Sequence, residues 1–326
     1  MKAGLLKILR ETDQYISGQQ LCEHFGVSRT AVWKAVGQLK EEGYEIEAVK
    51  NKGYRMVKTP DVMTAEEIRS RISTNWAGQN CICLECVDST NTQAKRLAED
   101  GAREGTLVTA EEQTGGKGRR GRSWASARGE NIMMTLLLRP KIRPEHASRL
   151  TLVMAMAVAE AIRKVTGLSS GIKWPNDVVV HGKKVCGILT EMSTEVDYIN
   201  YVVIGAGINV NQEVFPEEVK ETAGSLFLEL GKKIPRAPLV AAVLEELETF
   251  YEVFQKTEDL SALCTAYNRL CINRGHEIRV LEPGHAYTGT TDGINAKGEL
   301  VVKRTDGTIT EVYAGEVSVR GLYGYV

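Results

Sequence analysis

The sequence predicts a multidomain α+β protein with an N-terminal winged helix-turn-helix, a central mixed-sheet domain and a C-terminal β-barrel. The chain of 326 residues is longer than one hydrophobic core usually covers. Apolar residues first follow helical spacing, strands and helices then alternate, and closely spaced turn signals fill the last part. We therefore expect a winged-helix domain at 1–60, a linker helix in 61–74, a mixed α/β domain at 75–270 and the barrel at 271–326.

The first domain contains the pattern of two short helices joined by a tight turn. Gly26 can end the first helix, and Ser28 is a natural N-cap for the second, whose apolar stripe contains Val32, Val36 and Leu39. In a helix-turn-helix the first turn of the second helix points outward, where it can enter a groove of DNA. The residues in that position are Ser28, Arg29, Thr30, Trp33 and Lys34.

Two short alternating segments, 44–49 and 53–57, follow and predict a β-hairpin or wing. Its turn carries Lys50 and Lys52, which are suited to contacts with phosphate. Residues 1–60 contain ten Lys and Arg against seven Asp and Glu, whereas the whole chain has a net charge of -1. Only this part favours a nucleic-acid partner, and the alternative is a small helical domain used for protein contacts.

Pro60 and the capping pattern Thr64-Ala-Glu-Glu67 mark a boundary followed by a short linking helix. In the central domain the expected strands are 81–87, 106–110, 132–138 and 202–210, and the expected helices are 93–99 and 146–165. After residue 271 the turn signals are Pro283-Gly284, Asp292-Gly293, Lys297-Gly298 and Asp306-Gly307. Turns this close together predict a small β-barrel of roughly fifty residues.

The seven cysteines are odd in number and follow no disulfide spacing, and we expect no signal peptide. A reducing cytoplasm fits this usage best. Cys83-x-x-Cys86 permits a zinc interpretation, but no second pair follows, and segment 81–87 is typical of a buried strand. No apolar run approaches the roughly 20 residues needed to span a bilayer, so we expect a soluble protein with no membrane partner.

The most unusual segment is Gly115–Arg122, which contains four glycines and four cations. Such a loop cannot bury a core and its like charges repel, so we expect it to be mobile until an anion binds. Close backbone approach combined with Lys and Arg donors is what a phosphate or a nucleotide requires. From these residues alone, a nucleotide-binding loop and a solvated or nucleic-acid-binding basic loop are equally supported.

Two further features favour a binding cleft. The segment Lys173-Trp-Pro-Asn-Asp177 places an amide and a carboxylate just beyond a strand end, because Pro175 keeps Trp174 extended and prevents a helix. Lys184 begins an apolar run, so its stem can pack while its ammonium group faces a cleft. Each feature alone is compatible with an ordinary turn or surface residue, but together with the basic loop they indicate a site.

The order of these motifs resembles that of biotin protein ligases, in particular the bacterial enzymes that also repress the biotin operon. The matching residues are Asp88-Ser-Thr-Asn91, Gln113, Gly116–Arg122, Lys173–Asp177, Lys184 and Gly205-Ala-Gly-Ile-Asn209. The resemblance covers the whole chain. It implies a central catalytic domain like that of class II tRNA synthetases and a C-terminal SH3-like barrel.

The resemblance also implies a two-step reaction. Biotin and ATP with Mg²⁺ give biotinyl-5'-adenylate and pyrophosphate, and a lysine of a biotin carrier protein such as acetyl-CoA carboxylase then attacks the mixed anhydride. Biotin and ATP are substrates, and no permanently bound cofactor is implied. Adenylate formation brings an anionic carboxylate to an anionic phosphate, so fixed cations must offset the repulsion. The available cations are Lys117, Arg119, Arg120, Arg122 and Lys184.

By resemblance, the residues that bind biotin are Ser89, Thr90, Asn91, Gln113, Gly116, Lys117, Gly118, Arg119 and Lys184. Those that contact ATP or the adenylate are Arg120, Arg122, Trp124, Asn176 and Asn209. Arg119, Lys184 and Asp177 are the expected catalytic groups, with Asp177 steering the incoming lysine or holding Mg²⁺. The family loop usually begins Gly-Arg-Gly, whereas this chain has Lys117, which lacks the planar fork of arginine and predicts looser retention of the intermediate.

Three functional hypotheses follow. The first is a bifunctional enzyme and repressor, in which bound biotinyl-adenylate favours a homodimer that brings two winged helices to two half-sites of operator DNA. The second is an enzyme whose N-terminal domain is idle or contacts proteins, and the third is a regulator that senses biotin without chemistry. Lipoate ligation is the nearest enzymatic alternative, although the motifs fit the biotin branch better.

Overall fold

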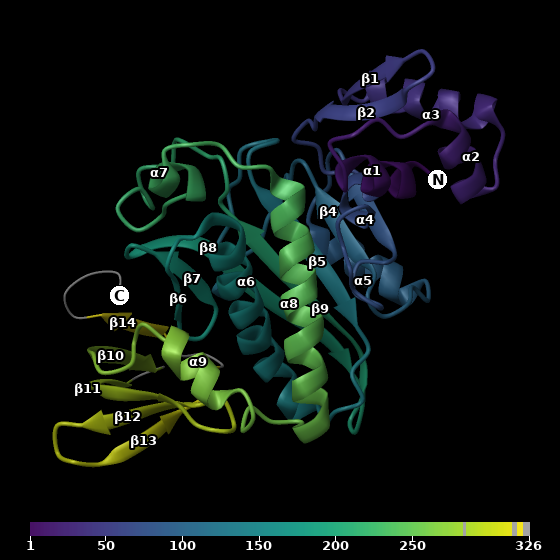
Figure 1. The fold of residues 1–326 in the computed structure, drawn as a ribbon. Helices are drawn as coiled ribbons and strands as arrows, with labels where there is room; N and C mark the ends of the chain where they lie inside the picture. Colours follow the sequence, from purple (N-terminus) through teal and green to yellow (C-terminus); the bar gives the residue numbers. More distant parts are fainter. Residues whose placement is uncertain (283–284, 315–317, 322–326) are drawn as a thin grey trace.

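The computed structural model describes residues 1–282, 285–314 and 318–321, which form three domains (Figure 1). The winged-helix domain and the C-terminal sheet lie at opposite ends of the central domain. The turn expected at Pro283-Gly284 falls outside the described residues. Within the ranges given above, no helix has the length and apolar character needed to cross a membrane.

The N-terminal domain is a winged helix-turn-helix with an apolar core of its own. Its elements are α1 (Lys2–Arg10), α2 (Gly18–Phe25), α3 (Arg29–Glu41), β1 (Glu45–Val49) and β2 (Gly53–Lys58). Gly26 ends α2 in the left-handed conformation with φ 63°, and the Ser28 hydroxyl accepts a hydrogen bond from the Ala31 amide at the start of α3. The expected apolar stripe of α3 is buried, so the predicted helix-turn-helix and wing are confirmed.

The central domain is built on a seven-stranded sheet in the order β3-β4-β5-β9-β8-β7-β6. The strands are β3 (Cys81–Leu84), β4 (Leu107–Ala110), β5 (Ile132–Leu138), β6 (Ser170–Lys173), β7 (Asp177–Val180), β8 (Lys183–Thr194) and β9 (Ile199–Ile208). Strands β3 and β4 are parallel, and every other neighbouring pair is antiparallel. The predicted mixed sheet is confirmed.

Helices cover both faces of this sheet. Helices α6 (Leu150–Thr166) and α8 (Arg236–Thr257) pack against each other along one face (Figure 1), and α5 (Thr90–Glu99) packs on β4, β5 and β9. Successive side chains of β5 point to opposite faces of the sheet and so enter two different cores. Leu136 and Leu138 belong to the large core with α6, whereas Leu137 belongs to a smaller core with Ala94 of α5. Odd-numbered residues of β5 therefore face the α5 side.

Three further α-helices are short: α4 (Ala65–Arg69) lies in the linker, and α7 (Leu226–Leu230) and α9 (Cys264–Leu270) belong to the central domain. The prediction of one helix over 146–165 is wrong at its start, because Pro144–Arg149 forms a 3₁₀ helix and α6 begins only at Leu150. Proline at the start of the 3₁₀ segment fixes φ and provides no backbone N–H. The chain therefore enters α6 through a tighter turn.

The C-terminal domain is an antiparallel sheet in the order β13-β12-β11-β10-β14. Its strands are β10 (Glu277–Glu282), β11 (His285–Ile294), β12 (Leu300–Arg304), β13 (Ile309–Val312) and β14 (Ser318–Gly321). Trp174 fixes this domain to the central one, since its backbone N–H donates to Asn273 Oδ1 at 2.8 Å and its indole N–H donates to the Gly298 carbonyl at 3.1 Å. The unusual Lys173–Asp177 segment thus also has a structural role.

A buried carboxylate joins the winged helix to the linker helix α4. Glu67 is only 1% exposed. It accepts hydrogen bonds from Arg10 at 2.8 Å, from the Tyr44 hydroxyl at 2.7 Å and from Arg71 at 2.6 Å. Thr64 caps the same helix through the Glu67 amide, as the sequence predicts. Burial raises the pKa of Tyr44 most, and the hydrogen bond to Glu67 raises it further, so the phenol stays neutral.

A second buried ion cluster joins the linker to the central domain. Arg236, at the start of α8, is 2% exposed. Its guanidinium donates to Asp61 of the linker at 3.0 Å and to Glu111, just after β4, at 2.5 Å. Gln113 lies only two residues beyond Glu111. The linker is therefore connected, through one arginine, to the segment that carries a predicted binding residue.

The cysteines of β3 behave as strand residues. The Sγ atoms of Cys81 and Cys83 are 3.4 Å apart, and all seven cysteines are free. In the part of the chain that the structure describes, no three His, Cys, Asp or Glu side chains are grouped in a way that could hold a metal ion. The predicted buried strand over 81–87 is too long, because β3 ends at Leu84 and Cys86 lies beyond it and is exposed.

Candidate functional site

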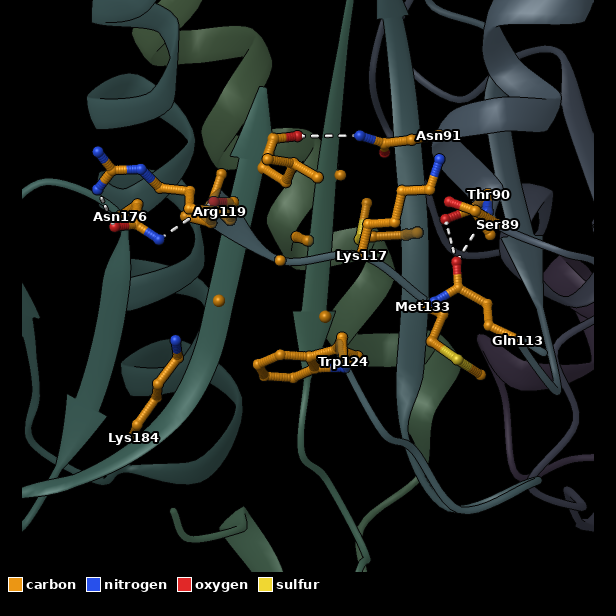
Figure 2. Close-up of a pocket in the computed structure, with 18 residues that line it drawn as sticks. Ser89, Thr90, Asn91, Gln113, Lys117, Arg119, Trp124, Met133, Asn176 and Lys184 are labelled. Carbon is orange, nitrogen blue, oxygen red and sulfur yellow. Dashed lines mark hydrogen bonds between the residues drawn. The ribbon is translucent and has the colours of Figure 1, made fainter. Parts of the chain in front are cut away.

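A pocket lies on the α5 face of the sheet, where the segments predicted to bind ligands converge (Figure 2). Its walls come from the start of α5, the loop after β4 and the central strands β5, β8 and β9. The predicted residues that line it are Ser89, Thr90, Asn91, Gln113, Lys117, Gly118, Arg119, Trp124, Asn176 and Lys184. The fold thus brings most of the predicted ligand-binding residues into one cavity.

Glycines in β8 and β9 make room for this pocket. Gly187 and Gly207 are paired across the two strands. A β-carbon on Gly187 would lie 2.9 Å from the ring of Trp124, and a β-carbon on Gly207 would lie 2.6 Å from it. A β-carbon on Gly205 would collide with Asn91 Oδ1. Glycine within a strand commonly marks a close approach by another group. The Gly-Ala-Gly run therefore has a steric role that its sequence pattern did not reveal.

One end of the pocket is polar and closely hydrogen-bonded. Gln113 Oε1 accepts from the Thr90 backbone N–H at 2.7 Å and lies 3.0 Å from the Thr90 hydroxyl. Thr90 and Asn91 are each 4% exposed, and Ser89 is 3% exposed. Because buried polar groups are held by their partners, this end presents a fixed set of donors and acceptors to a ligand.

The glycine-rich segment folds back over the pocket as a short hairpin. The Gly118 amide donates to the Arg122 carbonyl at 2.7 Å, and the Trp124 amide donates to the Gly116 carbonyl at 2.9 Å. Arg120 has φ 60°, in the left-handed region, at the turn. This path lays the Trp124 ring on β8 and β9 and directs Lys117 toward the start of α5 (Figure 2).

Cations occupy the opposite end of the pocket. Figure 2 shows Arg119, Asn176 and Lys184 on one side and Thr90 and Gln113 on the other. Arg119 donates to Asn176 Oδ1 at 2.8 Å and to the Ala314 carbonyl of the C-terminal domain at 2.6 Å. Burial lowers the pKa of Arg119, and the nearby Asp177 carboxylate acts in the opposite direction. The guanidinium nevertheless stays charged, as arginine does in proteins.

Lys184 lies beside Arg119 at the same end. Its Nζ is 2.6 Å from Asp177 Oδ1 and 5.5 Å from the centre of the Trp124 ring. Its side chain is 26% exposed, with the stem packed and the ammonium group facing the pocket. Two positive charges and one aromatic face thus meet where an anionic group would enter, which is an arrangement suited to a carboxylate next to a phosphate.

Some predicted residues lie outside the pocket lining. Arg120 and Arg122 are exposed on the loop, and Gly116 is adjacent to Gln113 without facing the cavity. Asp177 lies behind Lys184. Asn209 is buried at 3% exposure and donates to the Gly224 carbonyl at 3.0 Å, so it supports the backbone next to β9.

Sequence reasoning missed several residues of the site. Met133 lines the pocket from β5, and Thr135, also on β5, lies behind Thr90 and Asn91. Glu191 on β8 accepts from the Asn91 amide at 2.9 Å. The one feature of the sequence that could have indicated Thr135 is that it is a polar residue inside the apolar run 132–138. Glu191 could not be found without the register of β8.

The predicted DNA-contacting residues form an exposed surface on the N-terminal domain. Arg29, Thr30, Trp33 and Lys34 are exposed on the first two turns of α3, with Trp33 at 66%. The Ser28 hydroxyl is used as the helix cap. In the turn between β1 and β2 the predicted lysines, Lys50 and Lys52, are exposed. An exposed large aromatic side chain on the same helix turns as two exposed cations, Arg29 and Lys34, favours a nucleic-acid interface over a purely structural helix.

Comparisons with known proteins agree with this division into domains. Residues 83–209 match the biotin/lipoate A/B protein ligase family, residues 3–55 match an HTH domain, and residues 275–320 match the biotin protein ligase C terminal domain. The chain is 39% identical to the bifunctional ligase/repressor BirA of Bacillus subtilis (strain 168) over 322 residues, which is 98% of each chain. It is 30% identical to the bifunctional ligase/repressor BirA of Escherichia coli (strain K12), covering 94% of each chain.

A solved structure shows the same similarity in three dimensions. The structure is described as the biotin protein ligase from Aquifex aeolicus in complex with biotin and ATP. It is 33% identical to this chain with a TM-score of 0.66, over 74% of this chain and 99% of that one.

Proposed function

The chain belongs to the family of bifunctional biotin ligases and repressors, and we propose that its central pocket carries out both steps of biotin ligation. In the first step the biotin carboxylate attacks the α-phosphate of ATP, which forms biotinyl-5'-adenylate and releases pyrophosphate. In the second step the ε-amine of a lysine attacks the adenylate carbonyl, which forms an amide and releases AMP. The protein is an ATP-dependent biotin–protein ligase, and its protein substrate is a biotin carrier domain such as that of acetyl-CoA carboxylase.

The observation that carries this proposal is the opposition of Arg119 and Lys184 to Thr90 and Gln113 across one pocket. Biotin has a polar ureido ring at one end and a carboxylate at the other. The ring matches the buried polar end, and the carboxylate matches the cations. Lys117 extends over the ring side, and the cations lower the repulsion between carboxylate and phosphate.

The nucleotide would occupy the outer part of the pocket, under the loop. Trp124 offers a flat aromatic face, and Arg120 and Arg122 lie exposed on the loop, where they can reach phosphate oxygens. Asn176 is placed by Arg119, and Asp177 is placed by Lys184. Asp177 would then steer the incoming lysine amine, while Asn209 supports the adjacent backbone through Gly224.

Magnesium fits this site as part of the Mg·ATP substrate. Asp177 is a carboxylate just behind the pocket lining, and Lys184 already contacts its Oδ1 atom at 2.6 Å. Mg²⁺ usually keeps several waters and takes one or two protein carboxylates together with phosphate oxygens. Asp177 would therefore supply one oxygen to an ion that the triphosphate carries, and the ion would neutralise phosphate charge.

The N-terminal domain acts as a transcriptional repressor, with the surface of Arg29, Thr30, Trp33 and Lys34 toward operator DNA. We infer that biotinyl-adenylate is the corepressor and that it favours a homodimer, because two winged helices must reach two half-sites together. The Glu67 and Arg236 clusters support this coupling, since they connect the winged helix, the linker and the segment leading to Gln113. Both activities are expected in the cytoplasm.

Two finer aspects of the fold follow from the same family membership. We infer that the mixed seven-stranded sheet corresponds to the catalytic fold of class II tRNA synthetases, and that the antiparallel C-terminal sheet corresponds to an SH3-like barrel. The strand orders given above support both assignments.

The experiment that tests the enzyme function is incubation with radiolabelled biotin, Mg·ATP and a purified biotin carrier domain. We expect label on the carrier that depends on ATP. A carrier whose acceptor lysine is replaced by arginine serves as the control and should stay unlabelled. Tight biotin binding without any label on a competent carrier would contradict ligase function and would favour a biotin-sensing regulator.

Replacing Lys117 by arginine is expected to slow dissociation of biotinyl-adenylate severalfold. Arginine would restore a planar bidentate donor on the loop that covers the intermediate. The measurement is the dissociation rate of labelled adenylate after dilution into unlabelled adenylate. The matched control is Lys220→Arg, at a lysine that pairs with Glu217 on the surface. An unchanged rate in Lys117→Arg would show that the lysine at this position is equivalent to arginine.

Replacing Arg29 or Lys34 by alanine is expected to weaken operator binding about tenfold, while biotin ligation continues at the normal rate. Both side chains are exposed on the first turns of α3. Binding to DNA from the biotin operon is measured by fluorescence anisotropy at fixed salt, with adenylate present. The control is Lys40→Ala, which removes an exposed lysine from the far end of the same helix. Equal losses in all three variants would contradict the predicted orientation of α3 on DNA.

A further inference from the structure

A continuous chain of hydrogen bonds runs behind the polar end of the pocket. Lys95 donates to Glu191 Oε1 at 2.8 Å. The side-chain NH₂ group of Asn91 donates to Glu191 Oε2 at 2.9 Å and to the Leu189 carbonyl at 3.2 Å. Asn91 Oδ1 lies 2.7 Å from the Thr135 hydroxyl, which lies 2.8 Å from the Thr90 hydroxyl. The Thr90 hydroxyl then reaches Gln113 Oε1 at 3.0 Å. The chain therefore connects β8 to the pocket through three buried side chains.

The direction of this chain is fixed at both ends. Glu191 is ionised: burial pushes its pKa up, but the hydrogen bonds from Lys95 and Asn91 outweigh burial and hold the pKa below its ordinary value. A carboxylate only accepts, so the Asn91 NH₂ group must face it and Asn91 Oδ1 must face Thr135. At the other end, the Thr90 backbone N–H donates to Gln113 at 2.7 Å, which identifies the facing Gln113 atom as the oxygen.

The count of hydrogens then leaves one acceptor open. Two hydroxyl hydrogens, from Thr90 and Thr135, serve three short oxygen–oxygen contacts. Asn91 Oδ1 cannot donate, so the Thr135 hydrogen must lie on that 2.7 Å contact. The Thr90 hydrogen can then point to Thr135 or to Gln113, and in either case the Thr90 oxygen receives no hydrogen from these partners. Thr90 lines the pocket and is 4% exposed. An unsatisfied buried acceptor is costly, so a ligand N–H that reaches it gains affinity.

We propose that Glu191 is a specificity-determining residue that acts through Asn91 and Thr135 to keep the Thr90 hydroxyl an acceptor, so that the pocket selects an acid carrying an N–H donor. The proposal rests on the proposed ligase function and deepens it. A ureido ring has such a donor, whereas the dithiolane ring of lipoate has none. Glu191 and Thr135 are positioning residues, because neither is expected to touch the substrate. A site built around such an acceptor rejects a ligand that leaves it unpaired.

The test uses Glu191→Gln and the double variant Glu191→Gln/Thr135→Val. A glutamine can donate to Asn91 Oδ1, so Asn91 can turn over, giving up its 3.2 Å hydrogen bond to the Leu189 carbonyl, and donate to Thr135, whose hydrogen then satisfies Thr90 from inside the protein. We expect Glu191→Gln to raise the KM for biotin about tenfold, equivalent to one hydrogen bond, with kcat and the KM for ATP within about twofold. In the double variant Thr135 has no hydrogen to give, so the KM for biotin should return toward the normal value.

Rescue of this kind distinguishes positioning from simple structural damage. The single variant Thr135→Val completes the cycle, pyrophosphate release at saturating ATP is the readout, and the unfolding midpoint of each variant monitors folding. Inhibition by lipoate should strengthen in Glu191→Gln. An unchanged KM for biotin in Glu191→Gln, or a double variant that is weaker than Glu191→Gln, would overturn the proposal. Failure of the unmodified protein to form adenylate from biotin would instead count against the ligase function itself.

Discussion

Replacing Lys184 by alanine is expected to slow biotinyl-adenylate formation on the order of a hundredfold to a thousandfold, the effect typical of removing one group that stabilises charge in a transition state. The Lys184 ammonium group faces the pocket beside Arg119 and is held 2.6 Å from Asp177. Without it, carboxylate and phosphate must approach against their mutual repulsion, and Asp177 adds a further negative charge. Pyrophosphate release in a single turnover measures this step directly.

The neighbouring residue provides a matched control. Lys183 has the same charge, but its Nζ donates to the Glu221 carbonyl at 2.6 Å, outside the pocket. Lys183→Ala should therefore form adenylate at the normal rate. Adenylate formation in Lys184→Ala within tenfold of normal would contradict the assigned role and would leave Arg119 as the main cation at the carboxylate end.

Replacing Glu67 by alanine is expected to lower the stability of the junction between the winged helix and the central domain by about 3 kcal/mol. Glu67 is 1% exposed and receives hydrogen bonds from Arg10, Tyr44 and Arg71. Its removal leaves two guanidinium groups and a phenol without their shared acceptor. Because a chain of several domains does not unfold in one step, hydrogen exchange in α1 and α4 is the appropriate measurement.

The control for this junction is Glu45→Ala. Glu45 pairs with Lys58 at 3.3 Å, and both side chains are more than half exposed at 58% and 71%. Exposed pairs contribute little, so exchange in α1 and α4 should stay as it is in the unmodified protein. If Glu67→Ala exchanged no faster than Glu45→Ala, the two domains would have to be held together by contacts other than this cluster.

Sequence reasoning predicts the elements of this protein better than their contacts. Segment 132–138 was predicted as a strand and is β5 with the same bounds, because an apolar run between polar segments has few other solutions. The winged helix was predicted from Gly26 and Ser28, whose local conformations depend on neighbours in sequence. The start of α6 was missed because a 3₁₀ turn and an α-helix share similar apolar spacing over one turn.

The residues of the site also fall into those that motifs predict and those that only contacts identify. Ser89, Thr90, Lys117 and Lys184 were predicted from motifs, and all four line the pocket. Thr135, Glu191 and Arg236 were missed because their importance comes from the residues that face them, and sheet register and helix packing decide those pairings. A residue such as Glu191 is informative only when Asn91 is known to lie 2.9 Å away.

Arg119 connects the pocket to the C-terminal domain, since its guanidinium donates both to Asn176 and to the carbonyl of Ala314. During synthesis on the ribosome, a growing chain has no Ala314 until nearly all of its 326 residues have been joined. Until Ala314 has been added, the Arg119 guanidinium lacks one of these two acceptors, and the loop has one anchor fewer. Chains that end before Ala314 would lack this anchor of the Arg119 loop.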